Sequence, residues 1–218
     1  MASTAAANIR VLYATNRIRL PGKDVLVFVH GYSNTFTSAV QGAARLQVDI
    51  PFKEGPVVAF SWASWGKGEK YIEDGVIQGW SIEPFLKLLG LLKGAAKIHI
   101  LAHSMGNRIA LQALATLVSS SAPVTLPFGQ LIFAAADEDS DVFTRIMTHL
   151  VRANLGEGRT LYASCQDGAL WASARLHHDD RAGQVWPKVL LGGDSLPYQS
   201  RRPYVLVNGL DTIDCTGA

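Results

Sequence analysis

Features that would point to nucleic acid, a membrane or a disulfide framework are scarce in this sequence. Charged residues make up 17% of it, and the formal net charge is only +2. The basic residues are scattered, with Arg201 and Arg202 as their only adjacent pair, so we expect no nucleic-acid partner. The apolar stretch 85–92 is interrupted by Lys87 and is far shorter than the roughly 20 residues that cross a bilayer. We therefore expect no membrane span.

The marks of export and of metal binding are also missing. Residues 1–7 have no basic start and no apolar run, so the cytoplasm is the default location, with export open if a signal peptide was removed. Cys165 and Cys215 each end an apolar, strand-like run. A disulfide between them is open to an exported form, but we favour free buried thiols. Because zinc-like spacings and a glycine-rich phosphate loop are absent, we predict no metal and no other cofactor.

What the sequence does contain is a repeated alternation of strand and helix patterns. The run VLVFVH at 25–30 is continuous, β-branched and aromatic, which is typical of a parallel strand covered on both faces. Further strands are predicted at 57–61, 98–102, 131–135 and 160–164, an edge strand at 9–14, and short ones at 203–207 and 210–214. Helices are predicted at 35–48, 69–92, 107–118, 139–151 and 166–176. The alternation predicts one α/β domain over 1–218, with a mostly parallel central sheet and helices on both faces.

Two details qualify this pattern. Pro84 should kink or split the second predicted helix, because proline removes a helical hydrogen bond and clashes with the preceding turn. The segment 177–202 is rich in Gly, Pro, Asp and Ser, so it is predicted to be a long irregular connection.

The sharpest local pattern is a serine between a strand and a helix. In ILAHSMGN at 100–107, Ser104 follows the strand, and Ala102 and Gly106 are small residues two positions before and after it. The nucleophile elbow of the α/β-hydrolase fold needs small residues there because its turn is very tight, although the usual first glycine is an alanine here. Ser104 is therefore our candidate nucleophile. The alternative is that its hydroxyl merely N-caps the following helix.

A second pattern upstream supports the elbow. His30 and Gly31 end the strand 25–30, where this fold builds half of its oxyanion hole. The backbone N–H groups of Met105 and Tyr32 would then hold a developing oxyanion. On its own, the His-Gly pair would be a strand end with a turn. Three aromatic residues could wall an apolar acyl pocket, although ordinary packing is the more conservative interpretation of each: Trp62, Trp65 and Tyr71.

A serine nucleophile also needs a histidine to take its proton and a carboxylate to orient that histidine. In this fold the chain order is serine, acid, histidine. Asp167 directly follows the strand 160–164 and is our choice for the acid. Asp137, after the strand 131–135, is its competitor, and both residues could instead be helix N-caps.

The base is harder to place from the residues. The histidine should follow the last strand, yet residues 215–218 contain none. His177 and His178 lie in or just after a predicted helix, and they would serve as bases only if the connection 177–202 folds back over the sheet. A surface role is the alternative for both. The base is therefore open between these two histidines and a residue beyond Ala218.

Four ordered motifs extend through much of the chain: YATNR at 13–17, VFVHGY at 27–32, FSWAS at 60–64 and AHSMGN at 102–107. Together they resemble a bacterial family of α/β hydrolases known as a domain of unknown function, and the similarity continues through 136–143, 161–170 and 176–183. The resemblance implies an α/β-hydrolase fold with Ser104 as nucleophile and Asp167 as acid. In that family the histidine lies in a Gly-His-Ser type segment after the final strand, and this sequence has no such segment.

The function predicted from these patterns is hydrolysis of small-molecule carboxylic esters through an acyl-Ser104 intermediate. The rival hypothesis is a catalytically impaired α/β-hydrolase scaffold that binds a small ligand or a protein partner, which a missing histidine would favour. The acyl and alcohol groups of the substrate and the oligomeric state are not specified by the sequence.

Overall fold

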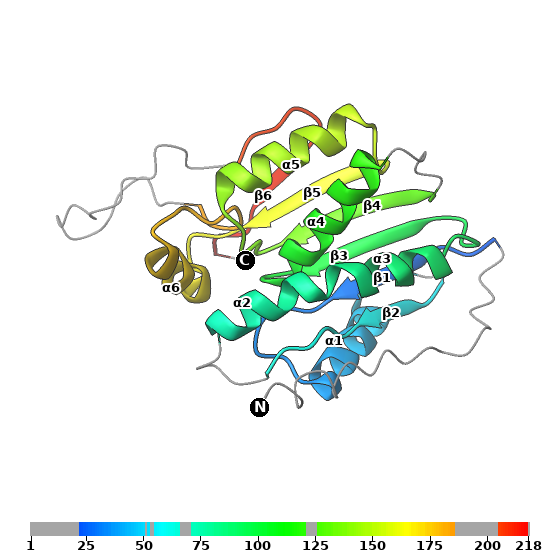
Figure 1. Ribbon diagram of the computed structural model, residues 1–218, viewed down its shortest axis with the longest axis horizontal. Helices are drawn as coiled ribbons and strands as arrows, with labels where there is room; N and C mark the ends of the chain where they lie inside the picture. The colour runs from blue at the N-terminus through cyan, green and yellow to red at the C-terminus, as the bar shows by residue number, and fades with distance from the viewer. Residues whose placement is uncertain are drawn as a thin grey trace.

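The protein is built on a parallel sheet that has helices on both faces (Figure 1). The computed structural model describes residues 22–50, 52, 55–65, 71–120, 126–185 and 205–217. The six-stranded sheet has the order β2-β1-β3-β4-β5-β6, and each neighbouring pair is parallel. Its strands are β1 (Val25–Val29), β2 (Val57–Phe60), β3 (Ile98–His103), β4 (Phe128–Ala134), β5 (Gly158–Ala163) and β6 (Asp211–Asp214). The predicted α/β architecture is confirmed.

The helices of the described residues cover the sheet from two sides. They are α1 (Phe36–Asp49), α2 (Tyr71–Trp80), α3 (Ile82–Leu91), α4 (Gly106–Ser119), α5 (Ser140–Arg152) and α6 (Gly168–His177). In Figure 1, α3, α4 and α5 lie across the face of the sheet that is turned toward the viewer. Residues of β1 alternate between the two faces. Val27 and Val29 belong to the core shared with α3 and α4, whereas the ring of Phe28 lies against Gly42 of α1.

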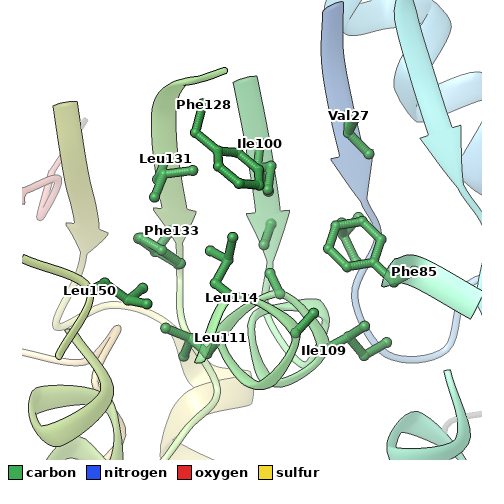
Figure 2. Packing of buried hydrophobic residues seen from close by; sticks show 14 of the residues in the cluster. Val27, Phe85, Ile100, Ile109, Leu111, Leu114, Phe128, Leu131, Phe133 and Leu150 are labelled. Carbon is green, nitrogen blue, oxygen red and sulfur yellow. The ribbon is translucent and has the colours of Figure 1, made fainter. Parts of the chain in front are cut away.

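The main core lies between the sheet and α4 (Figure 2). Ile109, Leu111 and Leu114 are completely buried although they lie on different sides of α4, because this helix packs against α3 and α5 as well as against the strands. Equally buried strand residues complete this core, among them Ile100 of β3 and Phe133 of β4. Burying each such side chain stabilises the fold by roughly 1.5–3 kcal/mol. The turn that enters α4 is therefore attached to one of the most firmly held elements of the protein.

The predicted helix over 69–92 is split into α2 and α3, as the proline led us to expect. The break falls at Ser81, and Pro84 is the third residue of α3. Amide groups in the first turn of a helix have no intrahelical acceptor, so the missing N–H of proline costs nothing there. The chain thus breaks three residues ahead of the proline.

Three predicted strands differ from the structure by more than two residues or lie outside it. β4 begins at Phe128 rather than at 131 and ends before Ala135, whose φ of +46° is incompatible with a strand. The prediction of a strand at 203–207 is wrong for 205–207, because the Val205 carbonyl accepts the hydroxyl of Thr212 instead of a ladder hydrogen bond. Residues 203–204 and the predicted strand 9–14 lie outside the described residues.

Candidate active site

Ser104 stands at a strained turn between β3 and α4. Its φ is +51°, in the left-handed region that costs a residue with a side chain about 1–2 kcal/mol. Three backbone hydrogen bonds hold it there: its N–H donates to the carbonyl of Ala134 at 3.0 Å, and its own carbonyl accepts the N–H groups of Asn107 at 3.1 Å and of Asp137 at 3.3 Å. The Asn107 side chain donates to that carbonyl as well, at 2.8 Å. Strain that the surroundings enforce in this way is typical of functional positions.

The hydroxyl of Ser104 is not used to cap α4. The N-cap of this helix is Met105, and no side chain caps it. Ser104 is half-buried, and its hydroxyl has no hydrogen-bond partner among the described residues. The alternative in which the serine is only a helix cap is therefore wrong, and the hydroxyl is left for another role.

The residues around Ser104 are small because other backbone lies against them. A Cβ built on Gly31 would lie 2.8 Å from the Cβ of Ser104, and one built on Gly106 would lie 2.4 Å from the carbonyl oxygen of His30. Real Cβ atoms do not approach so closely, so glycine is required at both positions. The turn after β1 and the turn after β3 therefore meet at their backbones.

This contact brings the two predicted oxyanion donors to the same end of the sheet. Met105 is completely buried and its amide opens α4, where the helix dipole favours negative charge. Tyr32 lies in the turn that follows β1, and the side chain of Asn34 shapes this turn by donating to the carbonyls of Gly31 and Tyr32 at 3.2 and 3.0 Å. Parallel strands place their carboxyl ends at one edge, which is where ligands of such sheets bind.

His30 is a structural residue rather than a base. It is 1% exposed, its Nδ1 lies 2.8 Å from the Gly31 carbonyl, and its Nε2 accepts the backbone N–H of Trp62 at 3.1 Å. The indole of Trp62 donates back to the His30 carbonyl at 2.7 Å and its ring stacks on the imidazole. Burial lowers the pKa of His30, so the ring is neutral and joins the ends of β1 and β2.

The aromatic residues considered as a pocket wall separate into different roles. Trp62 is buried against His30 and packs the core, whereas Trp65 is 47% exposed. Tyr71 is half-buried, and its ring lies edge-on to that of Tyr32 with centroids 5.1 Å apart.

Asp167 lies after β5, as predicted, and it caps a helix. One carboxylate oxygen accepts the backbone N–H groups of Ala169 and Leu170, each at 3.0 Å. Among the described residues no histidine is hydrogen-bonded to it. Its charge does reach His103, the neighbour of Ser104. Although His103 is exposed, desolvation lowers its pKa, and the negative charge of Asp167 partly offsets this effect.

Asp137, the competing acid, is 2% exposed and surrounded by donors. Its Oδ2 accepts the hydroxyl of Tyr71 at 2.6 Å, and its Oδ1 accepts the hydroxyl of Ser173 at 2.6 Å. Two guanidinium groups stand nearby, that of Arg108 at 3.4 Å and that of Arg181 at 3.7 Å from Oδ1. No histidine of the described residues hydrogen-bonds to this carboxylate. Sequence reasoning named Asp137 and Tyr71 but missed that they touch, because 66 positions separate them.

The two candidate bases end α6. His177 is its last residue and His178 its C-cap, with a φ of +59°, and both side chains are exposed. The ring of His177 lies 5.7 Å from that of Tyr71, centroid to centroid. Desolvation, followed by the positive charges of Arg181 and Arg108, lowers the pKa of His177. Its ring is thus neutral at pH 7 and can accept a proton.

The structure also bears on the predictions for the two cysteines, for metal binding and for a membrane span. Cys165 and Cys215 are free thiols, but both are half-buried rather than buried. They lie beyond neighbouring strands, where the Cys215 N–H donates to the Ala163 carbonyl of β5 at 2.7 Å. Within the described ranges, no group of three or more His, Cys, Asp or Glu residues could hold a metal ion. None of the helices described is both long and apolar enough to cross a membrane.

The comparisons with known proteins bear on this geometry at the level of the family. Phospholipase PlaB from Legionella pneumophila is a solved structure to which this chain is similar over 53% of its own length and 25% of that chain, with 16% identity and a TM-score of 0.28. The similarity therefore spans about a quarter of that protein. The curated proteins contain no match. Residues 8–215 match the family described as alpha/beta hydrolase of unknown function (DUF900), so this chain belongs to that α/β-hydrolase family.

Proposed function

We propose that this α/β-hydrolase-family protein cleaves carboxylic esters through an acyl-Ser104 intermediate. One observation carries the proposal: Ser104 has a left-handed φ of +51° at the β3–α4 turn, and its hydroxyl has no partner among the described residues. Residues held in such strained conformations cluster at active sites, ligand clamps and switch regions. A strained serine between small residues is what a nucleophile elbow requires.

The reaction would proceed in two steps. In the first, Oγ of Ser104 bonds to the ester carbonyl carbon, the bond to the alcohol oxygen breaks, and a histidine passes the serine proton to the leaving alcohol. In the second, water attacks the acyl-enzyme and releases the carboxylic acid. The backbone N–H groups of Met105 and Tyr32 would hold the oxyanion in both steps, and such donors are typically worth about 10²–10³ in rate each.

Asp167 is the acid in this proposal. It follows β5, the second strand beyond the elbow strand in the sheet order, and its charge acts on His103 beside the nucleophile. Its second carboxylate oxygen is free of the cap hydrogen bonds, which both use Oδ1. That oxygen would orient the imidazole.

Two described histidines border the site and are candidates for the base. His103 directly precedes Ser104, and His177 contacts Tyr71, whose ring contacts that of Tyr32. Replacing each by alanine distinguishes them, since loss of the base lowers kcat by several orders of magnitude. If both variants retain activity, the His178→Ala variant is tested next, and activity in all three places the base elsewhere in the chain.

A fluorophosphonate probe tests the nucleophile directly. The wild-type protein should be labelled at Ser104 and should hydrolyse p-nitrophenyl esters, and the Ser104→Ala variant should do neither. Ser119→Ala is a matched control, because Ser119 is an exposed serine at the opposite end of the same helix. If the folded wild-type protein neither reacts at Ser104 nor cleaves any ester of a series from acetate to decanoate, the proposal fails.

A further inference from the structure

A buried polar cluster lies directly behind the candidate nucleophile. We call it the Asp137 cluster, and its members come from three helices and two loops: Tyr71, Arg108, Asp137, Ser173 and Arg181. The Asp137 carboxylate at its centre is almost fully buried. A buried carboxylate is tolerated only where donors and positive charge surround it, as they do here. The chemistry of ester cleavage described above uses none of these side chains.

One branch of the cluster ends at the nucleophile turn. The backbone N–H of Asp137 lies 3.3 Å from the carbonyl oxygen of Ser104, toward which it donates. The Asp137 carbonyl in turn accepts Nε–H of Arg108 at 2.6 Å. Arg108 belongs to α4, the helix that Ser104 introduces. Asp137 thus ties the strained serine to the helix that follows it.

The other branch ends at Tyr32, in the turn after β1. The Tyr71 hydroxyl donates to Asp137 at 2.6 Å and accepts from Arg108 at 3.0 Å, so the phenol is held at its polar end. The ring of Tyr71 then packs edge-on against the ring of Tyr32, with an interplanar angle of 72°. Burial, and then the Asp137 charge, raise the pKa of Tyr71 to about 12. The hydroxyl therefore stays protonated and remains a donor at every working pH.

We propose that Asp137 and Tyr71 are positioning residues that set the two halves of the oxyanion hole relative to each other, Asp137 through the Ser104 carbonyl and Tyr71 through Tyr32. The inference rests on the proposed ester hydrolysis and adds a role for residues that touch neither substrate nor reacting atoms. Its physical basis is that oxyanion donors act only when they are preorganised about 2.7–3.1 Å from the developing charge. A displacement near 1 Å can cost about 10²-fold in rate.

The Tyr71→Phe variant tests the branch through Tyr32. It removes only the hydroxyl that anchors the ring, so the ring remains but can shift. We expect kcat for a p-nitrophenyl ester to fall about tenfold or more while KM changes less than twofold. Affinity for a trifluoromethyl ketone, which forms a tetrahedral adduct with an oxyanion, should fall by a similar factor. Tyr162→Phe is the matched control, because it deletes the hydroxyl of an exposed tyrosine on β5.

A merely structural role would give a different result. Destabilisation alone lowers the fraction of folded enzyme, and active-site titration with the fluorophosphonate probe corrects for this. If Tyr71→Phe, corrected in this way, keeps the wild-type kcat and ketone affinity, or changes only KM, the inference is overturned. Asp137→Asn extends the test to the branch through Ser104, because it removes the carboxylate charge that anchors Asp137 while keeping the backbone N–H that donates to Ser104. Tyr71→Phe alone suffices should that variant fail to fold. If wild-type Ser104 is never labelled, the proposed function fails instead.

Discussion

Gly31 lies directly against the side chain of Ser104, although 73 positions separate the two residues in the chain. A Cβ on Gly31 would come within 2.8 Å of the Cβ of Ser104 and within 2.8 Å of Nδ1 of His103. The turn after β1 is thus seated on the elbow itself. The packing around Ser104 is accordingly sensitive to a single methyl group on Gly31.

Gly31→Ala should therefore impair the site more than the fold. The added methyl group must displace either the turn at Ser104 or the turn after β1, and such overpacking typically costs about 1–3 kcal/mol. We expect fluorophosphonate labelling of Ser104 to slow at least tenfold, measured on folded protein at a temperature well below the transition midpoint. Wild-type labelling by the variant would mean that the contact does not constrain the hydroxyl.

Gly90→Ala provides the opposite case and a control for the glycine substitution. Gly90 lies in the last turn of α3, and a Cβ built on it meets nothing within 4 Å beyond its chain neighbours and the backbone of its own helix. Alanine is better than glycine inside a helix by about 0.8–1 kcal/mol. The free energy of unfolding should rise by about this amount in urea denaturation, with unchanged labelling of Ser104. A loss of stability would contradict the open surroundings of this position.

A pair of substitutions can separate the helix cap that Asp167 forms from its proposed role as the catalytic acid. Asparagine also caps helices well, whereas alanine does not, and losing the cap of α6 should cost about 0.5–2 kcal/mol. We expect Asp167→Asn to keep the thermal stability of the wild-type protein and to lower kcat by about 10³–10⁴, because an amide no longer stabilises the correct histidine tautomer. Asp167→Ala should lose both stability and kcat.

The control for this pair is Asp139, which caps α5 in the same way. Its Oδ1 accepts the N–H groups of Asp141 and Val142 at 2.9 and 2.8 Å. Asp139→Asn should leave kcat unchanged. If Asp167→Asn behaves like Asp139→Asn, Asp167 is only a helix cap.

The lowered pKa of His30 should make the free energy of unfolding depend on pH. Its pKa in the folded protein lies below the unfolded value of 6.5 because the ring is buried. Between these two values the unfolded chain binds the extra proton and the folded protein does not, so the free energy of unfolding falls as pH falls below about 6.5. We expect this decrease, measured by urea denaturation between pH 7.5 and 5, to be smaller in His30→Asn than in the wild-type protein. Equal slopes in the two proteins would show that His30 titrates normally when folded.

Much of the fold could be predicted because its signals are local. The β-branched run at β1 and the helical spacing in α4 carry their own burial patterns, since a buried parallel strand is apolar on both faces. Strand ends were predicted less well. β4 begins three residues before its predicted start. Phe128 pairs with β3 and Gln130 pairs with β5, but Gly129 and the polar Gln130 interrupt the apolar pattern from which the strand was predicted.

In the candidate site, too, local features were predicted from the sequence and features that depend on distant contacts were not. The elbow at Ser104 was predicted from sequence because a tight turn requires small residues at fixed positions beside it. The neutral state of His30 was not, because its tautomer depends on the Trp62 N–H, 32 positions away. The Asp137 cluster has no sequence signal at all, since Tyr71 and Ser173 are 102 positions apart and meet only through packing.

The sequence by itself determined the order of strands and helices, the place of the strained serine and the requirement for glycine or alanine around it, because each follows from neighbours a few residues away. Only the tertiary structure decided that Asp137 is surrounded by two arginines, a tyrosine and a serine, whereas Asp167 keeps one oxygen clear of its helix cap. Whether a carboxylate faces cations, hydroxyl groups or a helix end depends on which distant elements pack together, and no local pattern encodes that choice.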